Sequence, residues 1–160
     1  MNMSEHKATI AWRRKDSAFL DGKYSREHTW IFDGGVTVPA SPSPAIVPEP
    51  FSNAARVDPE EAFVAAVASC HMLTFLFLAS QGGFQVESYH DEAVGVMTEN
   101  EQGIRWISAI DLHPVIAYGG EKIPSAAEEK RLHDYAHRQC FIANSIRSAI
   151  TLNGSPTHDS

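Results

Sequence analysis

Residues 58–83 read DPEEAFVAAVASCHMLTFLFLASQGG, and this stretch decides the fold expected for the chain. Asp58 is suited to cap the amino end of a helix and Pro59 fits its first position. Two glutamates follow, beside the positive end of the helix dipole. The adjacent glycines at 82 and 83 are typical of a helix end. The stretch therefore predicts one long helix over residues 59–81.

The middle of this helix, residues 62–79, carries no charge and is nearly long enough to span a bilayer. Ser69, His71 and Thr74 interrupt the apolar run, and no cluster of lysine or arginine flanks it. We therefore expect a soluble protein in which the helix is buried on all sides, with no membrane partner. A chain of 160 residues has little material to cover such a helix, so we expect an intertwined homodimer.

Composition and charge narrow the class of protein. The chain is 43% hydrophobic and 21% charged, which predicts a single globular domain over residues 1–160. The net charge of −7 and the scattered basic residues argue against a nucleic-acid partner. The amino-terminal 15 residues are polar and lack the apolar core of a secretion signal, so we expect a cytoplasmic protein. Its two cysteines would then rest as thiols.

The segment before the helix predicts a β-meander. Its β-rich runs are separated by glycine-containing turns and cover residues 7–13, 24–32 and 36–38. Residues 39–50 contain five prolines, and they predict an extended connection to the helix.

The segment after the helix predicts a hairpin and a second helix. Residues 84–97 and 103–117 are the two strands of the hairpin. Ser125 and Glu128 form a capping-box pattern, from which helical periodicity continues to about Ile150. The tail beyond it is expected to be loose. The predicted fold is α+β, with both helices packed on one face of an antiparallel sheet.

Cys70 lies in the middle of the long helix. Helical periodicity gives it an apolar face, shared with Phe63, Ala66, Val67, Thr74 and Phe77. A free cysteine in such a place usually acts as a small hydrophobic residue. Burial also raises the pKa of a thiol, so a nucleophilic Cys70 needs a cation from elsewhere in the chain.

Arg26 is the candidate cation, because it lies in a predicted strand among apolar and aromatic residues. Glu60 could hold it through a bidentate ion pair. The alternatives are an arginine on the solvated face of its strand and a glutamate that serves only the helix dipole. A straight helix separates Glu60 from Cys70 by ~15 Å. An arginine that reaches both therefore requires a helix break, a long reach or a second subunit.

Three segments resemble the OsmC-like superfamily, which includes the organic hydroperoxide resistance proteins. Residues 58–71 look like its signature, with Pro-Glu followed by small and apolar residues and then the reactive cysteine. AHRQCFIANS, residues 136–145, is similar to the segment with the resolving cysteine. REHTW, residues 26–30, followed by DGG, is similar to the strand with the pocket arginine. The resemblance covers roughly residues 20 to 150.

The resemblance implies a thiol-dependent peroxidase that reduces organic hydroperoxides. A Cys70 thiolate, stabilised by Arg26, would attack the peroxide oxygen and become a sulfenic acid. Glu60 would orient Arg26. Cys140 would then condense with Cys70 as a disulfide, which an external dithiol reduces. The cycle needs no metal, flavin or haem. The apolar residues expected to bind the substrate, and so to favour an alkyl hydroperoxide, are Phe63, Val67 and Phe77.

Two features depart from the family pattern and leave the branch open. Phe141 follows Cys140 where the organic hydroperoxide resistance proteins usually have proline, and His71 follows the first cysteine. The alternative function is a stress-related module that binds a small ligand in the same pocket with little peroxidase turnover. A metal site of His133, His137 and Cys140 is the weakest alternative, because no fourth ligand lies at short spacing.

Overall fold

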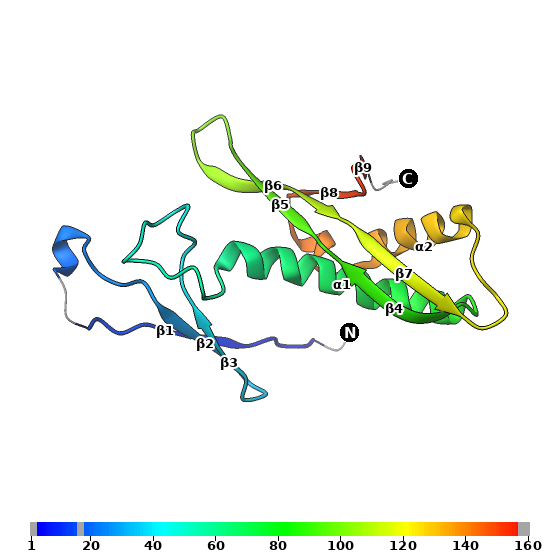
Figure 1. Cartoon of the computed structure of the whole chain (residues 1–160), viewed down its shortest axis with the longest axis horizontal. Helices are drawn as coiled ribbons and strands as arrows, with labels where there is room; N and C mark the ends of the chain where they lie inside the picture. The colour runs from blue at the N-terminus through cyan, green and yellow to red at the C-terminus, as the bar shows by residue number, and fades with distance from the viewer. Residues whose placement is uncertain (1–2, 16–17, 157–160) are drawn as a thin grey trace. The chain divides into compact units, whose positions relative to one another are not determined.

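The computed structural model of the chain describes residues 3–15 and 18–156 (Figure 1). The chain divides into two compact units, Met1–Ala62 and Phe63–Ser160. The N-terminal unit has one three-stranded sheet, and the C-terminal unit has a two-stranded and a four-stranded sheet. That the chain is a single domain stays a prediction.

The N-terminal unit contains the predicted β-meander. Its strands are β1 (Ala8–Ala11), β2 (His28–Phe32) and β3 (Thr37–Ala40), and they pair antiparallel in that order, with a short 3-10 helix, η1 (Phe19–Asp21), between β1 and β2. The prediction that Arg26 lies within a strand is wrong. Its backbone N–H donates to the carbonyl of Phe51 at 3.0 Å instead of to a neighbouring strand, so β2 begins only at His28.

The long predicted helix is present as α1 (Pro59–Gln81). Asp58 caps it through its Oδ1, which accepts from the N–H of Glu61 at 2.7 Å, and the Glu61 carboxylate accepts from the N–H of Asp58 at 3.2 Å. These reciprocal bonds satisfy N–H groups that have no partner inside a helix. Gly83 follows the helix with a φ of 77°, in the left-handed region that glycine adopts without strain.

α1 is only partly buried in the single chain, and its burial on all sides in a homodimer stays a prediction. By length and composition α1 could cross a membrane, but one stripe of it is packed inside the C-terminal unit. The buried stripe consists of Val67, His71, Phe75 and Ala79. Leu73 and Phe77 are 60% exposed in the single chain, so the helix is not covered on all sides. The spacing of four residues in the stripe is that of one helix face.

The predicted hairpin is present, but each of its arms is broken in two. The four strands are β4 (Gln85–Asp91), β5 (Val94–Glu99), β6 (Arg105–Leu112) and β7 (Pro114–Gly119). β4 pairs antiparallel with β7, and β5 pairs antiparallel with β6. The two pairs belong to separate sheets.

The second helix is α2 (Ala126–Gln139), and it begins with the predicted capping box of Ser125 and Glu128. The prediction that it continues to about Ile150 is wrong. It ends at Cys140, whose backbone is extended, and a short 3-10 helix, η2 (Ala143–Ser145), follows. The chain then forms β8 (Ala149–Leu152), parallel to β6, and β9 (Ser155–Pro156), antiparallel to β8. The fold is α+β, and one of its sheets is mixed.

Two hydrophobic clusters form the core of the C-terminal unit, and both include the α1 stripe. The first joins α1 to the mixed sheet through Val67, Ile110, Leu112 and Ile150. The second joins α1 to β4, β7 and α2, and is built around Phe75, Ala79, Phe84 and Ala136. α1 is therefore the element that holds the C-terminal unit together.

Gly95 of β5 marks a close approach of the sheet to α1. A Cβ atom at this position would lie 2.5 Å from Cγ2 of Val64. We expect Gly95→Ala to lower the free energy of unfolding by ~1–3 kcal/mol in urea denaturation, because overpacking forces its neighbours apart. Adding Val64→Ala should recover part of the loss. Gly34→Ala, at a glycine with open space and an ordinary φ, is the control and should change stability little.

Candidate functional site

The two cysteines, 70 residues apart in the sequence, come together in the C-terminal unit. Cys70 lies on α1 and Cys140 directly follows α2. Both are free thiols, and their Sγ atoms are 2.6 Å apart. Cys70 is half-buried, whereas Cys140 is only 1% exposed. The pair can form a disulfide with little movement of the backbone.

A set of hydrogen bonds fixes the backbone around Cys140. The side-chain amide of Asn144 donates to the carbonyls of Arg138 at 2.9 Å and Cys140 at 2.8 Å, where α2 ends. The backbone N–H of Asn144 donates to the Cys140 carbonyl at 3.1 Å. Ala143 donates its N–H to the Cys140 sulfur at 3.3 Å. Asn144 was not predicted as a site residue, although it lies in the quoted segment 136–145.

The environment of Cys140 keeps its thiol protonated. Burial raises the pKa of Cys140 to about 11, and the hydrogen bond with Cys70 adds to the effect. Cys140 is therefore the donor in this pair and Cys70 the acceptor. The two thiols therefore differ, because the pKa of Cys140 is raised and Cys70 is the more exposed of the two.

A cavity of about 660 Å³ is lined by residues close in sequence to both cysteines, although neither cysteine belongs to its lining. The residues that line it come from α1 and from the end of α2, and are Leu73, Thr74, Phe77, Arg138, Gln139, Phe141 and Asn144. Thr74 connects this wall to the cysteine, because its hydroxyl donates to the Cys70 carbonyl at 2.9 Å. The cavity has both aromatic and charged residues in its wall.

Of the three residues predicted to bind the substrate, only Phe77 lines this cavity. The prediction for Val67 needs correction, because Val67 is fully buried in the first core cluster and faces no open space. Phe63 also packs against that cluster. Both residues support α1, since the face of the helix that meets the sheet differs from the face that carries Phe77.

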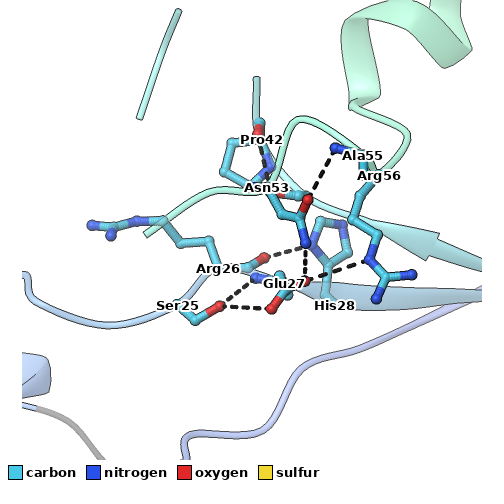
Figure 2. A network of polar contacts seen from close by, with 9 residues as sticks. Ser25, Arg26, Glu27, His28, Pro42, Asn53, Ala55 and Arg56 are labelled. Carbon is cyan, nitrogen blue, oxygen red and sulfur yellow. Dashed lines mark hydrogen bonds and ion pairs between the residues drawn. The ribbon is translucent and has the colours of Figure 1, made fainter. Parts of the chain in front are cut away.

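Arg26 lies in the N-terminal unit, where polar contacts hold the backbone on both sides of it (Figure 2). Glu27 accepts from the amide of Asn53 at 2.8 Å and from Arg56 at 3.4 Å. These contacts, the Asn53 hydrogen bond first, lower the pKa of the Glu27 carboxyl. His28 Nε2 accepts from the indole of Trp30, so the ring carries its proton on Nδ1 and donates it to the Arg26 carbonyl at 2.8 Å.

The Arg26 side chain points away from this network (Figure 2). Its terminal nitrogens donate to the carbonyls of Tyr24 at 2.8 Å and Gly22 at 3.2 Å, and its guanidinium carbon lies 4.0 Å from the centre of the Tyr24 ring. Among the described residues Arg26 forms no ion pair, with Glu60 or any other acid. That Glu60 orients Arg26, within one chain or across a dimer, stays a prediction.

Two buried histidines lie between α1 and α2. His71 Nε2 and His133 Nδ1 are 3.0 Å apart, and the two rings are stacked with their planes 8° apart. Desolvation by burial lowers the pKa of His71 to about 3 and that of His133 to about 4. Over residues 3–15 and 18–156, no group of three suitable side chains could hold a metal ion, which leaves the proposed set of His133, His137 and Cys140 without support.

Comparison with known proteins identifies the family of the chain. The sequence profile of the family described as OsmC-like protein matches residues 52–154. The chain belongs to the OsmC-like family. This confirms the resemblance that the two cysteine segments indicated. An OsmC-like protein of unknown function from Vibrio cholerae O1 biovar eltor str. N16961 shares 48% identity with a TM-score of 0.91, over 94% of this chain and 99% of that one.

More distant solved structures share the fold of this OsmC-like protein. An organic hydroperoxide resistance protein from Elizabethkingia anophelis, with thiocyanate bound, has 17% identity and a TM-score of 0.69 over 94% of each chain. A putative organic hydroperoxide resistance protein from V. cholerae, with captopril in one of its active sites, has 18% identity and a TM-score of 0.63 over 98% of this chain and 96% of that one. No curated protein matches the chain.

The buried histidine pair predicts how the stability of this OsmC-like protein depends on pH. Both pKa values are lower in the folded state than the ordinary value of 6.5, so the stabilisation is complete above pH 6.5 and is lost as the pH falls below it. Between pH 7.5 and pH 5.5 we expect a loss of about 1.4 kcal/mol for each histidine in urea denaturation. His90→Gln, which removes an exposed histidine, should leave the dependence unchanged. Equal stability at the two pH values would contradict the assignment of a neutral pair.

We expect Asn144 to affect the rate at which Cys70 and Cys140 form a disulfide. Asn144→Asp keeps the size of the side chain but removes its two N–H donors. The segment around Cys140 then loses the hydrogen bonds to the carbonyls of Arg138 and Cys140. We expect diamide to form the Cys70–Cys140 disulfide at least ~5-fold more slowly, because small misplacements of reacting atoms are costly. The matched control is Ser145→Ala, which removes a hydrogen bond to the Phe141 carbonyl in the same 3-10 helix and should react as wild type.

Proposed function

We propose that this OsmC-like protein is a thiol-dependent peroxidase that reduces organic hydroperoxides through Cys70 and Cys140. The observation that carries the proposal is the separation of 2.6 Å between the two free sulfurs, which belong to elements far apart in the sequence. Membership of a family that includes organic hydroperoxide resistance proteins supports it. The V. cholerae relative at 48% identity has no known function. The proposed reaction is therefore argued from the geometry of the two cysteines and not from that relative.

The exposure of the two thiols supports Cys70 as the nucleophile. Cys140 is 1% exposed, and its raised pKa keeps it protonated. Cys70 is more open to solvent and lies one helical turn from Thr74, which lines the cavity. Cys70 is therefore the thiol that solvent and a peroxide can reach more easily.

The proposed cycle has three steps. The Cys70 thiolate attacks the terminal oxygen of ROOH and the O–O bond breaks, so that Cys70 becomes a sulfenic acid. The alkoxide takes a proton from water and leaves as ROH. The Cys140 thiol then attacks the Cys70 sulfur, which forms the disulfide and releases water. An external dithiol reduces this disulfide by exchange, is itself oxidised to a disulfide, and returns both thiols.

Arg26 is proposed to stabilise the Cys70 thiolate, with Glu60 orienting it, from the same subunit or from a partner. Arg26 has no counter-ion among the described residues, which leaves its charge available to a thiolate. We also propose a homodimer, because Leu73 and Phe77, one turn apart on α1, are each 60% exposed in the single chain. A cytoplasmic location stays a prediction.

The cavity of about 660 Å³ favours an apolar substrate. Leu73, Phe77 and Phe141 are 60%, 60% and 84% exposed, and they offer apolar contacts to the organic group of an alkyl hydroperoxide. Hydrogen peroxide has no such group and gains nothing from them. The same cavity supports the alternative function, a module that binds a small ligand with little turnover, because its walls do not depend on the thiols.

The test compares cumene hydroperoxide with hydrogen peroxide on the reduced protein, with consumption of peroxide and the intramolecular disulfide followed by mass spectrometry. We expect faster reaction with cumene hydroperoxide and no reaction in Cys70→Ser. Cys140→Ser should turn over once and stop at a sulfenic acid that dimedone traps. Equal and slow consumption by wild type and Cys70→Ser would reject the peroxidase and favour the ligand-binding module.

A further inference from the structure

The tip of the β5–β6 hairpin and the segment before β8 line a cavity of about 440 Å³. All three strands belong to one sheet of the C-terminal unit. Among the described residues of the lining, Trp106 is the one apolar residue, and the others are polar or charged. The volume is that of an ordinary small-molecule pocket. The proposed peroxidase cycle uses none of these residues, so it gives the cavity no role.

Hydrogen bonds hold both walls of the cavity in place. At the hairpin tip, Oδ1 of Asn100 accepts from the backbone N–H groups of Gln102 at 3.0 Å and Ile104 at 2.9 Å. On the other side, the hydroxyl of Ser148 donates to a carbonyl of β6 at 2.6 Å, which ties the residue next to Arg147 to the sheet. A cavity whose backbone is already ordered loses less entropy when a ligand binds.

Charged side chains of both signs line the cavity, and they do not pair with one another. Glu99 and Glu101 come from the hairpin, and Arg147 comes from the segment before β8. Over residues 3–15 and 18–156 none of the three forms an ion pair. The guanidinium carbon of Arg147 lies 5.7 Å from the centre of the Trp106 ring, within the range of a cation–π contact. The indole therefore helps to place a cation whose N–H donors fit a carboxylate.

The signs of these charges determine which ligand the cavity favours. A ligand with only a negative group could pair with Arg147, but two glutamates would repel it. A ligand with only a positive group could pair with the glutamates, but Arg147 would repel it. A zwitterion has a partner for each charge in the wall. Arg105 lies opposite Glu99 in the β5–β6 pair but outside the described lining, so Arg147 is the cation that faces the ligand.

We propose that this cavity binds a free aromatic α-amino acid. The carboxylate of the ligand pairs with Arg147, its ammonium group pairs with Glu99 and Glu101, and its ring packs against Trp106, the apolar surface of a polar lining. The proposal goes beyond the peroxidase reaction and does not depend on it, because neither cysteine lines the cavity.

The test uses three probes that share one ring. L-phenylalanine has both charges, phenethylamine lacks the carboxylate and 3-phenylpropanoate lacks the ammonium group. Affinities for the reduced, full-length, ¹⁵N-labelled protein are measured from the indole N–H signal of Trp106, assigned with Trp106→Phe. We expect L-phenylalanine to bind at least ~3-fold more tightly than either analogue, a modest factor because exposed ion pairs are weak. Trp12 and Trp30 lie in the N-terminal unit, and their signals should stay in place.

Variants assign the two charged groups of the ligand separately. Arg147→Gln should weaken L-phenylalanine at least ~3-fold and should not weaken phenethylamine. The double variant Glu99→Gln and Glu101→Gln should weaken L-phenylalanine and phenethylamine but not 3-phenylpropanoate. The matched control is Arg105→Gln, which removes the same charge from an exposed residue outside the described lining and should bind as wild type.

Three results would each overturn the proposal. They are equal affinity for L-phenylalanine and either analogue, no binding of L-phenylalanine up to ~10 mM, and a shift of Trp12 or Trp30 in place of Trp106. If a charge variant fails to fold, the three probes on wild-type protein still decide. Cys70→Ser should bind L-phenylalanine as wild type, so a failure of the peroxidase proposal leaves this one standing. Loss of binding in Cys70→Ser would place the ligand elsewhere and reject the site.

Discussion

The packing of one face of α1 is the constraint on which the C-terminal unit depends. Val67 and Phe75 are fully buried on that face, and each belongs to a different core cluster. The first cluster fixes the mixed sheet and the second fixes β4, β7 and α2. Because α2 is held against α1, its carboxyl end brings Cys140 to Cys70. The thiol pair is thus a consequence of helix packing, and the chemistry proposed for it uses a contact that the core already requires.

The packing of α2 on α1 buries two polar rings, those of His71 and His133, and these rings restrict how the helices align. Each ring is almost completely buried between the helices, and one hydrogen bond joins Nε2 of His71 to Nδ1 of His133. This bond satisfies one nitrogen of each ring, which lowers the cost of burying the pair. It also restricts the register of α2 on α1, since sliding by one turn would separate the two nitrogens. The residue that departed from the family pattern at position 71 therefore has a structural role next to Cys70.

The sequence predicted the elements whose signals are local. Asp58 and Ser125 mark the helix starts because capping depends on neighbouring residues only. The strand β8 was missed because its parallel partner, β6, lies about 40 residues away and leaves no local pattern. Arg26 was placed inside a strand because Tyr24–His28 has β-forming residues, whereas the Phe51 carbonyl decides its backbone. The resemblance named both cysteines, but their distance could come only from the folded chain.

The position of Cys140 has a consequence for the cohesion of the whole C-terminal unit. A disulfide between the cysteines would close a covalent ring, about 70 residues around, that contains β4 to β7 and all of α2. Closing a ring of that size removes conformations from the unfolded chain and stabilises the fold by about 4 kcal/mol. In the proposed cycle the protein would thus be most resistant to unfolding while it waits for its reductant, and each reduction would return it to a looser state.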